Sequence, residues 1–78
     1  MSNRLYIANL DYSTSQDELR QAFEPFGALS SVSVLTGKSR GFGFVEYKHA
    51  RDALRASESL DGLDLDGRRI SVRVERRR

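Results

Sequence analysis

The octapeptide from Arg40 to Tyr47, RGFGFVEY, constrains the fold of this chain more than any other segment does. Successive side chains of a β-strand point to opposite faces, so as a strand this segment divides into two rows. One row holds Gly41, Gly43, Val45 and Tyr47, and the other holds Arg40, Phe42, Phe44 and Glu46. The first row suits the core, because it is uncharged and its glycines let a helix approach the sheet closely. The second row carries charges that are costly to bury, so we expect Phe42 and Phe44 to face solvent and to serve a ligand.

The segment from Leu5 to Leu10, LYIANL, has the same organisation. In a strand, Leu5 and Ile7 share one face, whereas Arg4, Tyr6 and Ala8 share the other. An aromatic side chain again lies beside a basic one. The two segments therefore predict two strands that present aromatic rings on a face outside the core.

Both segments resemble the signatures of a known family. RGFGFVEY resembles the longer ribonucleoprotein signature of the RNA recognition motif at every position, and LYIANL resembles the shorter signature. The resemblance extends to Leu60–Gly62 and Gly67–Val72, and it covers roughly residues 3–74. It implies an α+β, ferredoxin-like βαββαβ fold, in which a four-stranded antiparallel sheet has the strand order 4-1-3-2 and carries two helices on one face.

The residues between the signatures support this order of elements. Ser15-Gln16-Asp17-Glu18 is a capping box that predicts the start of a helix, and Pro25 predicts an irregular last turn. Alternation around Val32 predicts the second strand, Thr36–Ser39 a turn into the third, and alternation over Arg69–Val74 the fourth. The apolar stripes predicted for the two helices are Leu19, Ala22, Phe23 and Phe26, and Ala50, Ala53, Leu54 and Leu60.

The resemblance implies a binding site for single-stranded nucleic acid on the open face of the sheet. Tyr6 and Phe42 match family positions that each stack a base. Phe44 matches a position that packs on the sugars between two nucleotides, and Arg40 one that pairs with a phosphate. Strand parity and proximity add four second-rank RNA-binding candidates, namely Arg4, Lys38, Ser71 and Arg73.

Length and composition bound the remaining possibilities. The 78 residues are sufficient for one small domain, with a core at about residues 3–75 and a basic tail or linker at residues 76–78. The net charge is only +2, so charge alone does not indicate a nucleic-acid partner. The absence of cysteine excludes disulfides and thiolate metal sites, and we expect no metal and no cofactor. No apolar run has the length of a membrane span, so no membrane partner is expected.

We therefore predict sequence-tolerant to moderately specific binding of single-stranded RNA, in mRNA processing or regulation. Single-stranded DNA stays open as a second ligand. The protein is expected to be a monomer inside the cell, in the nucleus, the cytoplasm or both. The main alternative is a protein–protein interaction module of the same fold that uses its helical face. In a longer protein, a terminal helix or a second domain could also cover Phe42 and Phe44. The turn at Thr36–Ser39 is shorter than the family's usual loop, so contact with fewer nucleotides than average is expected.

An enzymatic function is not expected. Gly41 and Gly43 lie inside a strand, where they cannot form an anion-binding loop. His49 has no nucleophile or acid–base partner in the sequence, so it is interpreted as a helix-entry residue. Tyr12 and Tyr47 are interpreted as structural. The acidic set is interpreted as a solvated loop and consists of Asp61, Asp64 and Asp66.

Overall fold

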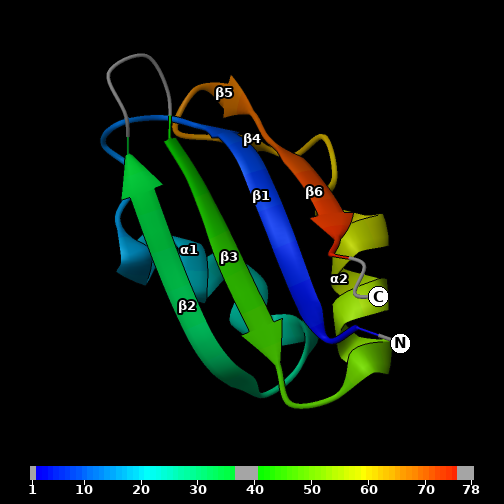
Figure 1. The fold of residues 1–78 in the computed structure, drawn as a ribbon. Helices are drawn as coiled ribbons and strands as arrows, with labels where there is room; N and C mark the ends of the chain where they lie inside the picture. The colour runs from blue at the N-terminus through cyan, green and yellow to red at the C-terminus, as the bar shows by residue number, and fades with distance from the viewer. Residues whose placement is uncertain (1, 37–40, 76–78) are drawn as a thin grey trace.

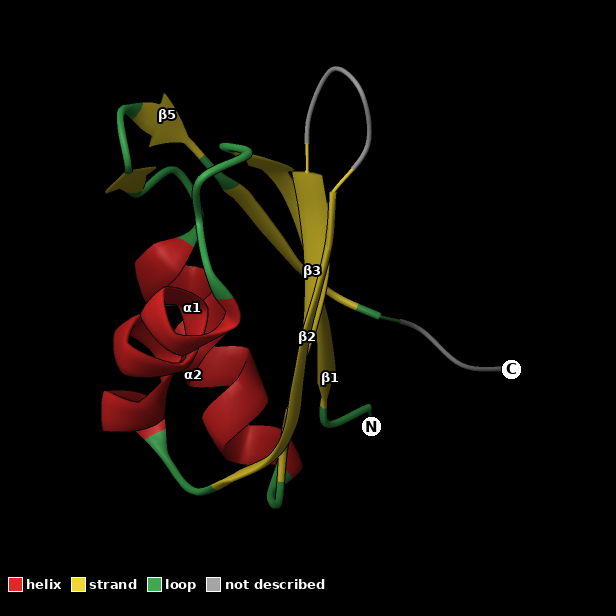
Figure 2. Cartoon of the chain, turned by 90° about the vertical axis from the view of Figure 1, so that its left-hand side faces the viewer, coloured by secondary structure: helices red, strands yellow, loops and turns green. Residues whose placement is uncertain are grey.

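The computed structural model describes residues 2–36 and 41–75. The elements are β1 (Arg4–Leu10), α1 (Gln16–Phe23), the 3-10 helix η1 (Glu24–Phe26), β2 (Leu29–Thr36), β3 (Gly41–Tyr47), α2 (Ala50–Leu60), β4 (Asp64–Leu65), β5 (Arg68–Arg69) and β6 (Ser71–Val74). Four of the strands form an antiparallel sheet in the order β2-β3-β1-β6. Both helices lie on the same side of this sheet (Figures 1 and 2). The predicted α+β, ferredoxin-like fold with strand order 4-1-3-2 is confirmed.

The core lies between the sheet and the helices, and β3 lines it with the predicted row. Gly41, Gly43, Val45 and Tyr47 are all buried. At Gly43, a β-carbon would lie 2.6 Å from the carbonyl oxygen of Ser33 and 3.2 Å from Cδ2 of Leu19. Glycine is therefore required at this position for β3 to pair with β2 and to pack closely against α1. The other core residues come from β1, β2, both helices and the C-terminal segment, and include Leu5, Ile7, Leu10, Phe23, Val32, Ala53, Ile70 and Val72.

Helix α1 begins and ends as the sequence predicts. The Oγ of Ser15 accepts a hydrogen bond from the amide of Glu18 at 3.1 Å, and the amide of Ser15 donates to the Glu18 carboxylate at 3.2 Å. The helix ends at Phe23, and the chain continues as a 3-10 turn that contains Pro25. A proline in a helix interior removes a backbone donor and clashes with the preceding turn, which explains the change of geometry.

Helix α2 differs from its predicted apolar stripe. His49 is the N-cap residue, which confirms its interpretation as a helix-entry residue. The buried residues of α2 are Ala53, Ala56, Ser57 and Leu60, whereas Leu54 is 40% exposed. Consecutive residues of an α-helix are rotated by about 100°, so Leu54 is turned away from the line that joins Ala53 to Ser57. The assignment of Leu54 to the core stripe is wrong.

The predicted fourth strand is divided in the structure. Arg69 pairs with Asp64 in a small hairpin of β4 and β5, and β6 begins only at Ser71. The backbone of Ile70 explains the break, because its amide donates to Leu63 and its carbonyl accepts from the amide of Gly62, each at 2.9 Å. These bonds hold Ile70 to the base of the hairpin, so only the shorter segment Ser71–Val74 pairs with β1.

Two of the three acidic residues near this hairpin have structural partners. Asp61 accepts a hydrogen bond from the amide of Val72 at 2.9 Å, and Asp66 accepts one from Oγ1 of Thr14 at 2.7 Å. Asp61 and Asp66 are nevertheless exposed, so the interpretation of the acidic set as solvated is confirmed, and these two residues have a structural role in addition. Asp64 is exposed, as expected.

Candidate functional site

Strands β1 and β3 place three aromatic rings together on the face of the sheet opposite the helices. Tyr6 lies directly across from Phe44 in the β1–β3 register, and Phe42 lies two residues along the same strand. The ring centroids are 5.5 Å apart for Tyr6 and Phe44, 5.9 Å for Tyr6 and Phe42, and 6.3 Å for the two phenylalanines. We call these three residues the aromatic cluster. The sequence predicted all of its members.

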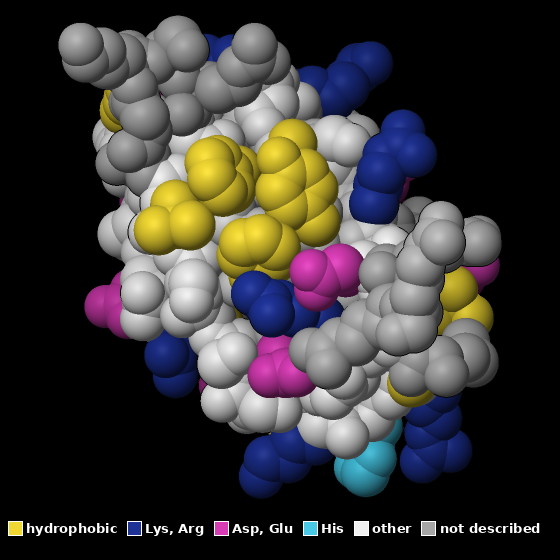
Figure 3. Space-filling model, in the orientation of Figure 1, with side chains coloured by type: hydrophobic (Ala, Val, Ile, Leu, Met, Phe, Trp, Pro, Cys, Tyr) yellow, Lys and Arg dark blue, Asp and Glu magenta, His cyan; other side chains and the backbone are white. Residues whose placement is uncertain are grey.

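The aromatic cluster remains accessible although its rings touch one another. Tyr6 is 38% exposed, and Phe42 and Phe44 are half-buried. The interplanar angles of the three pairs are 42°, 55° and 87°, so no ring is stacked face to face on another. Hydrophobic side chains accordingly gather over the central strands of this face (Figure 3). Such a surface offers π-faces to a flat, apolar ligand.

Leu35 on β2 extends this apolar surface, and sequence reasoning missed it. It lies opposite Phe42 in the β2–β3 register and is 49% exposed. Strand alternation could have placed Leu35 on the open face, because it follows Ser31 and Ser33 at a spacing of two residues and so shares their face. An exposed leucine beside an aromatic ring can contact the edge of a bound base or sugar.

The basic candidates divide into described and undescribed residues. Arg4 lies against the aromatic cluster, with its guanidinium carbon 4.2 Å from the centroid of the Phe44 ring. Arg73 on β6 is exposed and lies opposite Tyr6, so it belongs to the same face. Ser71 lies opposite Ala8, further along the pairing of β1 with β6. The positions predicted for Lys38 and Arg40, and for the terminal arginines Arg76–Arg78, lie outside the described residues.

The two remaining tyrosines have different environments. Tyr47 is fully buried, and its hydroxyl donates a hydrogen bond to the carbonyl oxygen of Phe23 at 2.6 Å. Burial, with a smaller contribution from the charge of Asp52, raises the pKa of the Tyr47 phenol above its ordinary value. Its structural interpretation is confirmed. Tyr12 is 50% exposed, so its burial does not support its interpretation as structural.

Residues 2–36 and 41–75 contain neither a group of side chains placed to hold a metal ion nor a helix of membrane-spanning length. Within these ranges, no three His, Cys, Asp or Glu side chains are placed to hold a metal ion. Likewise, neither of the helices described here has the length and apolar character needed to cross a membrane.

Asp11 has a lowered pKa because the side chain and the amide of Ser13 both donate hydrogen bonds to its carboxylate. These bonds belong to a local turn.

A hollow of about 780 Å³ lies apart from the aromatic cluster, between α2 and β6. Leu54, Val72 and Val74 contribute its apolar lining, and Glu58 and Glu75 contribute acidic groups. The aromatic cluster lies on the face of the sheet, whereas this hollow lies at the sheet's edge, where Arg73 is also part of its lining. Stacking of a nucleic-acid base requires an accessible ring face and does not require an enclosed cavity. The aromatic cluster is therefore the stronger candidate site.

Comparison with known proteins gives consistent results. The family model described as "RNA recognition motif" matches residues 5–71. The U1 small nuclear ribonucleoprotein 70 kDa of Xenopus tropicalis is 40% identical over 78 residues, which are 95% of this chain and 17% of that protein. The 29 kDa chloroplastic ribonucleoprotein A of Nicotiana sylvestris is 45% identical over 75 residues, or 91% of this chain and 28% of that protein. The chain thus spans less than a third of the length of these relatives.

Solved structures show the same fold. The crystal structure of the RNA-binding protein PG1 superimposes with a TM-score of 0.87 at 34% identity, and the match covers 99% of this chain and 98% of that one. The Mip6 RRM3 domain superimposes with a TM-score of 0.90 at 22% identity, with 95% and 93% of the two chains covered. At that lower identity, the second likeness supports the fold alone.

Proposed function

The chain belongs to the RNA recognition motif family, and from this premise we propose that it binds single-stranded RNA through the aromatic cluster. The family binds RNA, and the match implies no catalytic activity. The observation that carries the proposal is the meeting of three rings from two strands on a face that neither α1 nor α2 covers. In the assigned roles, Tyr6 and Phe42 each stack a base, and Phe44 packs on the sugars between two nucleotides.

The charged groups around the rings fit the backbone of such a ligand. We assign Arg73 to a contact with a phosphate, because it is exposed beside Tyr6. We assign Ser71, two residues away on β6, to a hydrogen bond with the RNA. Arg4 is also placed to reach a phosphate, since its guanidinium already lies over Phe44. Lys38 and Arg40 keep their assignment to phosphates from the sequence alone.

The expected affinity is moderate. Base stacking on an aromatic side chain contributes about 1 to 3 kcal/mol per base, so three rings contribute roughly 3 to 9 kcal/mol before the cost of ordering the strand. A dissociation constant on the order of micromolar follows. Stacking tolerates any base, so we propose sequence-tolerant to moderately specific binding, with single-stranded DNA as a second ligand.

We further propose that residues from about 3 to 75 form the binding unit and act as a monomer without a cofactor. The ribonucleoprotein names of the relatives support a role inside the cell, in mRNA processing or regulation. Those names also include chloroplastic and mitochondrial proteins, so they do not favour the nucleus over the cytoplasm.

The decisive experiment is a titration with a random-sequence, single-stranded RNA pool, followed by amide chemical-shift mapping. We expect shifts to concentrate on β1 and β3, with smaller changes on α2. A parallel titration with DNA of the same sequences measures the selectivity between the two nucleic acids. If RNA leaves the β1 and β3 amides unmoved, the proposal is wrong. A protein partner at the hollow beside Leu54 would then be the better account of this chain.

A further inference from the structure

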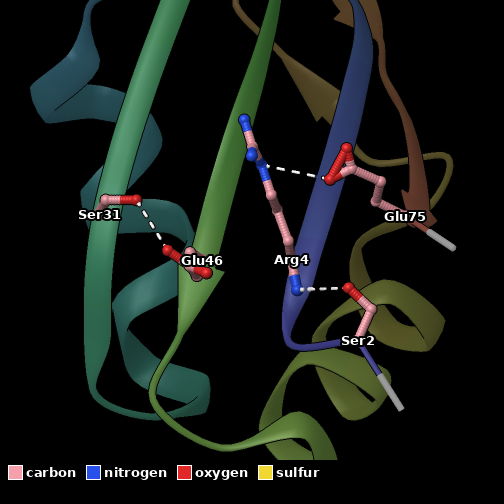
Figure 4. Close-up of polar contacts among 5 residues, drawn as sticks. All are labelled: Ser2, Arg4, Ser31, Glu46 and Glu75. Atoms are coloured by element: carbon pink, nitrogen blue, oxygen red, sulfur yellow. Dashed lines mark hydrogen bonds and ion pairs between the residues drawn. The ribbon is translucent and has the colours of Figure 1, made fainter. Parts of the chain in front are cut away.

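Arg4 lies between two carboxylates and is paired with only one of them. In the β1–β3 register Arg4 lies opposite Glu46, while on the other side of β1 the amide of Glu75 donates to the carbonyl oxygen of Arg4 at 2.8 Å. The Nε of Arg4 lies 3.3 Å from Oε1 of Glu75. Glu46 instead accepts a hydrogen bond from Oγ of Ser31 at 3.4 Å. Figure 4 shows the Arg4 side chain between β1 and β3 with its end toward β3, the Glu75 carboxylate reaching across to Nε of Arg4, and the Glu46 carboxylate turned toward Ser31.

The Arg4–Glu75 pair is partly withdrawn from solvent. The two side chains are 35% and 32% exposed, and the Oε1 atom of Glu75 is itself buried. Among the described residues, this oxygen has no hydrogen-bond partner, so the charge of Arg4 is its main compensation. A buried carboxylate oxygen that depends on one cation resists the loss of that cation. The pair therefore has a reason to persist in the unbound protein.

The same arginine covers part of the proposed binding site. The guanidinium of Arg4 lies 4.2 Å from the centroid of the Phe44 ring, which is the distance of a stacked cation–π contact. A sugar that packs on this face of Phe44 needs the space that the guanidinium occupies. Glu75 thus holds a cation over one of the three rings on which the proposed function depends.

We propose that Glu75 lowers the affinity of this face for single-stranded RNA by holding Arg4 over Phe44, and that a backbone phosphate must replace Glu75 as the partner of Arg4 when RNA binds. This inference rests on the proposed function and assigns a regulating role to a residue outside the aromatic cluster. A carboxylate is planar and a phosphodiester is tetrahedral, but each presents two anionic oxygens to the fork of a guanidinium, so the two groups compete for the same donors.

The competition has a specific signature in the salt dependence. A phosphate that is neutralised by a free cation releases about 0.7 counterions from a single strand. When the cation comes from an existing ion pair, salt also screens and weakens that pair, which offsets part of the salt dependence of the new contact. Loss of the Glu75 charge should therefore make the dependence of log K on log salt steeper, by up to about 0.7, in addition to any gain in affinity.

The test compares Glu75→Gln with Glu46→Gln. Both variants remove one negative charge beside Arg4 on the same face, and both glutamines keep an acceptor oxygen. We expect Glu75→Gln to tighten binding to the single-stranded RNA pool by about 3- to 10-fold and to steepen the salt slope. Glu46→Gln should change affinity by less than about 2-fold and leave the slope unchanged, because Glu46 is paired with Ser31.

A double-mutant cycle and a ligand-free measurement complete the test. In an Arg4→Ala background, the effect of Glu75→Gln should fall to that of Glu46→Gln. In the free protein, Glu75→Gln should shift the Nε–H resonance of Arg4, and Glu46→Gln should not. Equal effects of the two glutamine variants on affinity and slope would overturn the inference while leaving the proposed function intact. If the parent protein does not bind the RNA pool, the proposed function fails and this inference fails with it.

Discussion

Tyr6 and Phe44 face each other across β1 and β3 with ring centroids 5.5 Å apart, at the centre of the four-stranded sheet. Each ring is tilted against the other by 55°, so neither hides the face of its neighbour. β1 and β3 come from distant parts of the chain and are adjacent only in the folded sheet. The aromatic cluster therefore forms only in the folded protein. Binding and folding can nevertheless be separated, since the two faces of β3 carry different rows of residues.

The first prediction concerns the open face. Phe42→Ala should weaken binding of single-stranded RNA by about 1 to 3 kcal/mol and leave the fold intact, because it removes one stacking surface. Fluorescence anisotropy measures the affinity, and circular dichroism checks the fold. Leu54→Ala is the matched control, since it truncates an apolar side chain that is 40% exposed on α2 and should not affect RNA binding. Normal binding by Phe42→Ala, or its unfolding, would contradict the assigned role.

The second prediction concerns the opposite row of the same strand. Gly43→Val should lower the free energy of unfolding by roughly 1 to 3 kcal/mol or more, because even a β-carbon would lie 2.6 Å from the Ser33 carbonyl oxygen. Thermal unfolding measures this change. Ser33→Val adds the same branched side chain on the exposed face of the neighbouring strand and should keep the melting temperature within a few degrees. Equal melting temperatures for the parent and Gly43→Val would mean that the core row has been misassigned.

The features that the sequence predicted are those that depend on local periodicity. Alternation in a strand assigns Phe42 and Gly43 to opposite faces whatever the rest of the chain does. The capping box at Ser15 and the break at Pro25 are equally local. The resemblance then supplied the strand order, which no local pattern contains.

The features that the sequence did not predict depend on contacts between distant residues. The β4–β5 hairpin is tied to β1 because the side-chain amide of Asn9 donates to the carbonyl oxygen of Arg69 at 2.9 Å, and Arg68 donates to Oδ1 of Asn9 at 2.6 Å. Similarly, strand alternation assigns Arg4 to the open face, but its ion pair with Glu75 instead of Glu46 depends on the position of the chain after β6. Neither the hairpin contacts nor this ion pair can be predicted from a local sequence pattern.

The third prediction concerns the buried hydroxyl of Tyr47. Since the pKa of this phenol is raised in the folded protein, the folded state holds the proton more tightly than the unfolded state does. The stability contributed by the protonated phenol is therefore complete below the unfolded value of about 10 and is lost as the pH rises above it. Tyr47→Phe should lose about 1 to 3 kcal/mol at neutral pH, because the Phe23 carbonyl oxygen loses its donor.

Melting temperatures measured from neutral pH to above about pH 10 test this assignment. The gap in stability between the parent and Tyr47→Phe should narrow at the alkaline end, because only the parent has a phenol to ionise at this position. A gap that stays constant through this range would show that the environment of Tyr47 does not favour its protonated form.

The last prediction uses salt to separate stacking from charge. If Lys38, Arg40, Arg73 and one terminal arginine contact phosphates, about three or four counterions leave, and log K should fall against log salt with a slope of about −2 to −3. Arg4 adds little to this slope in the parent, because its charge is already paired with Glu75. Deletion of Arg76–Arg78 should change the slope by less than about 1 if these residues are a linker, and by more if they form a phosphate-binding arm. Phe42→Ala should lower the affinity at every salt concentration without changing the slope, since stacking releases no counterions. A parent slope near zero would show that the basic residues do not contact the nucleic acid, and a protein partner would then be the better explanation for the exposed aromatic cluster.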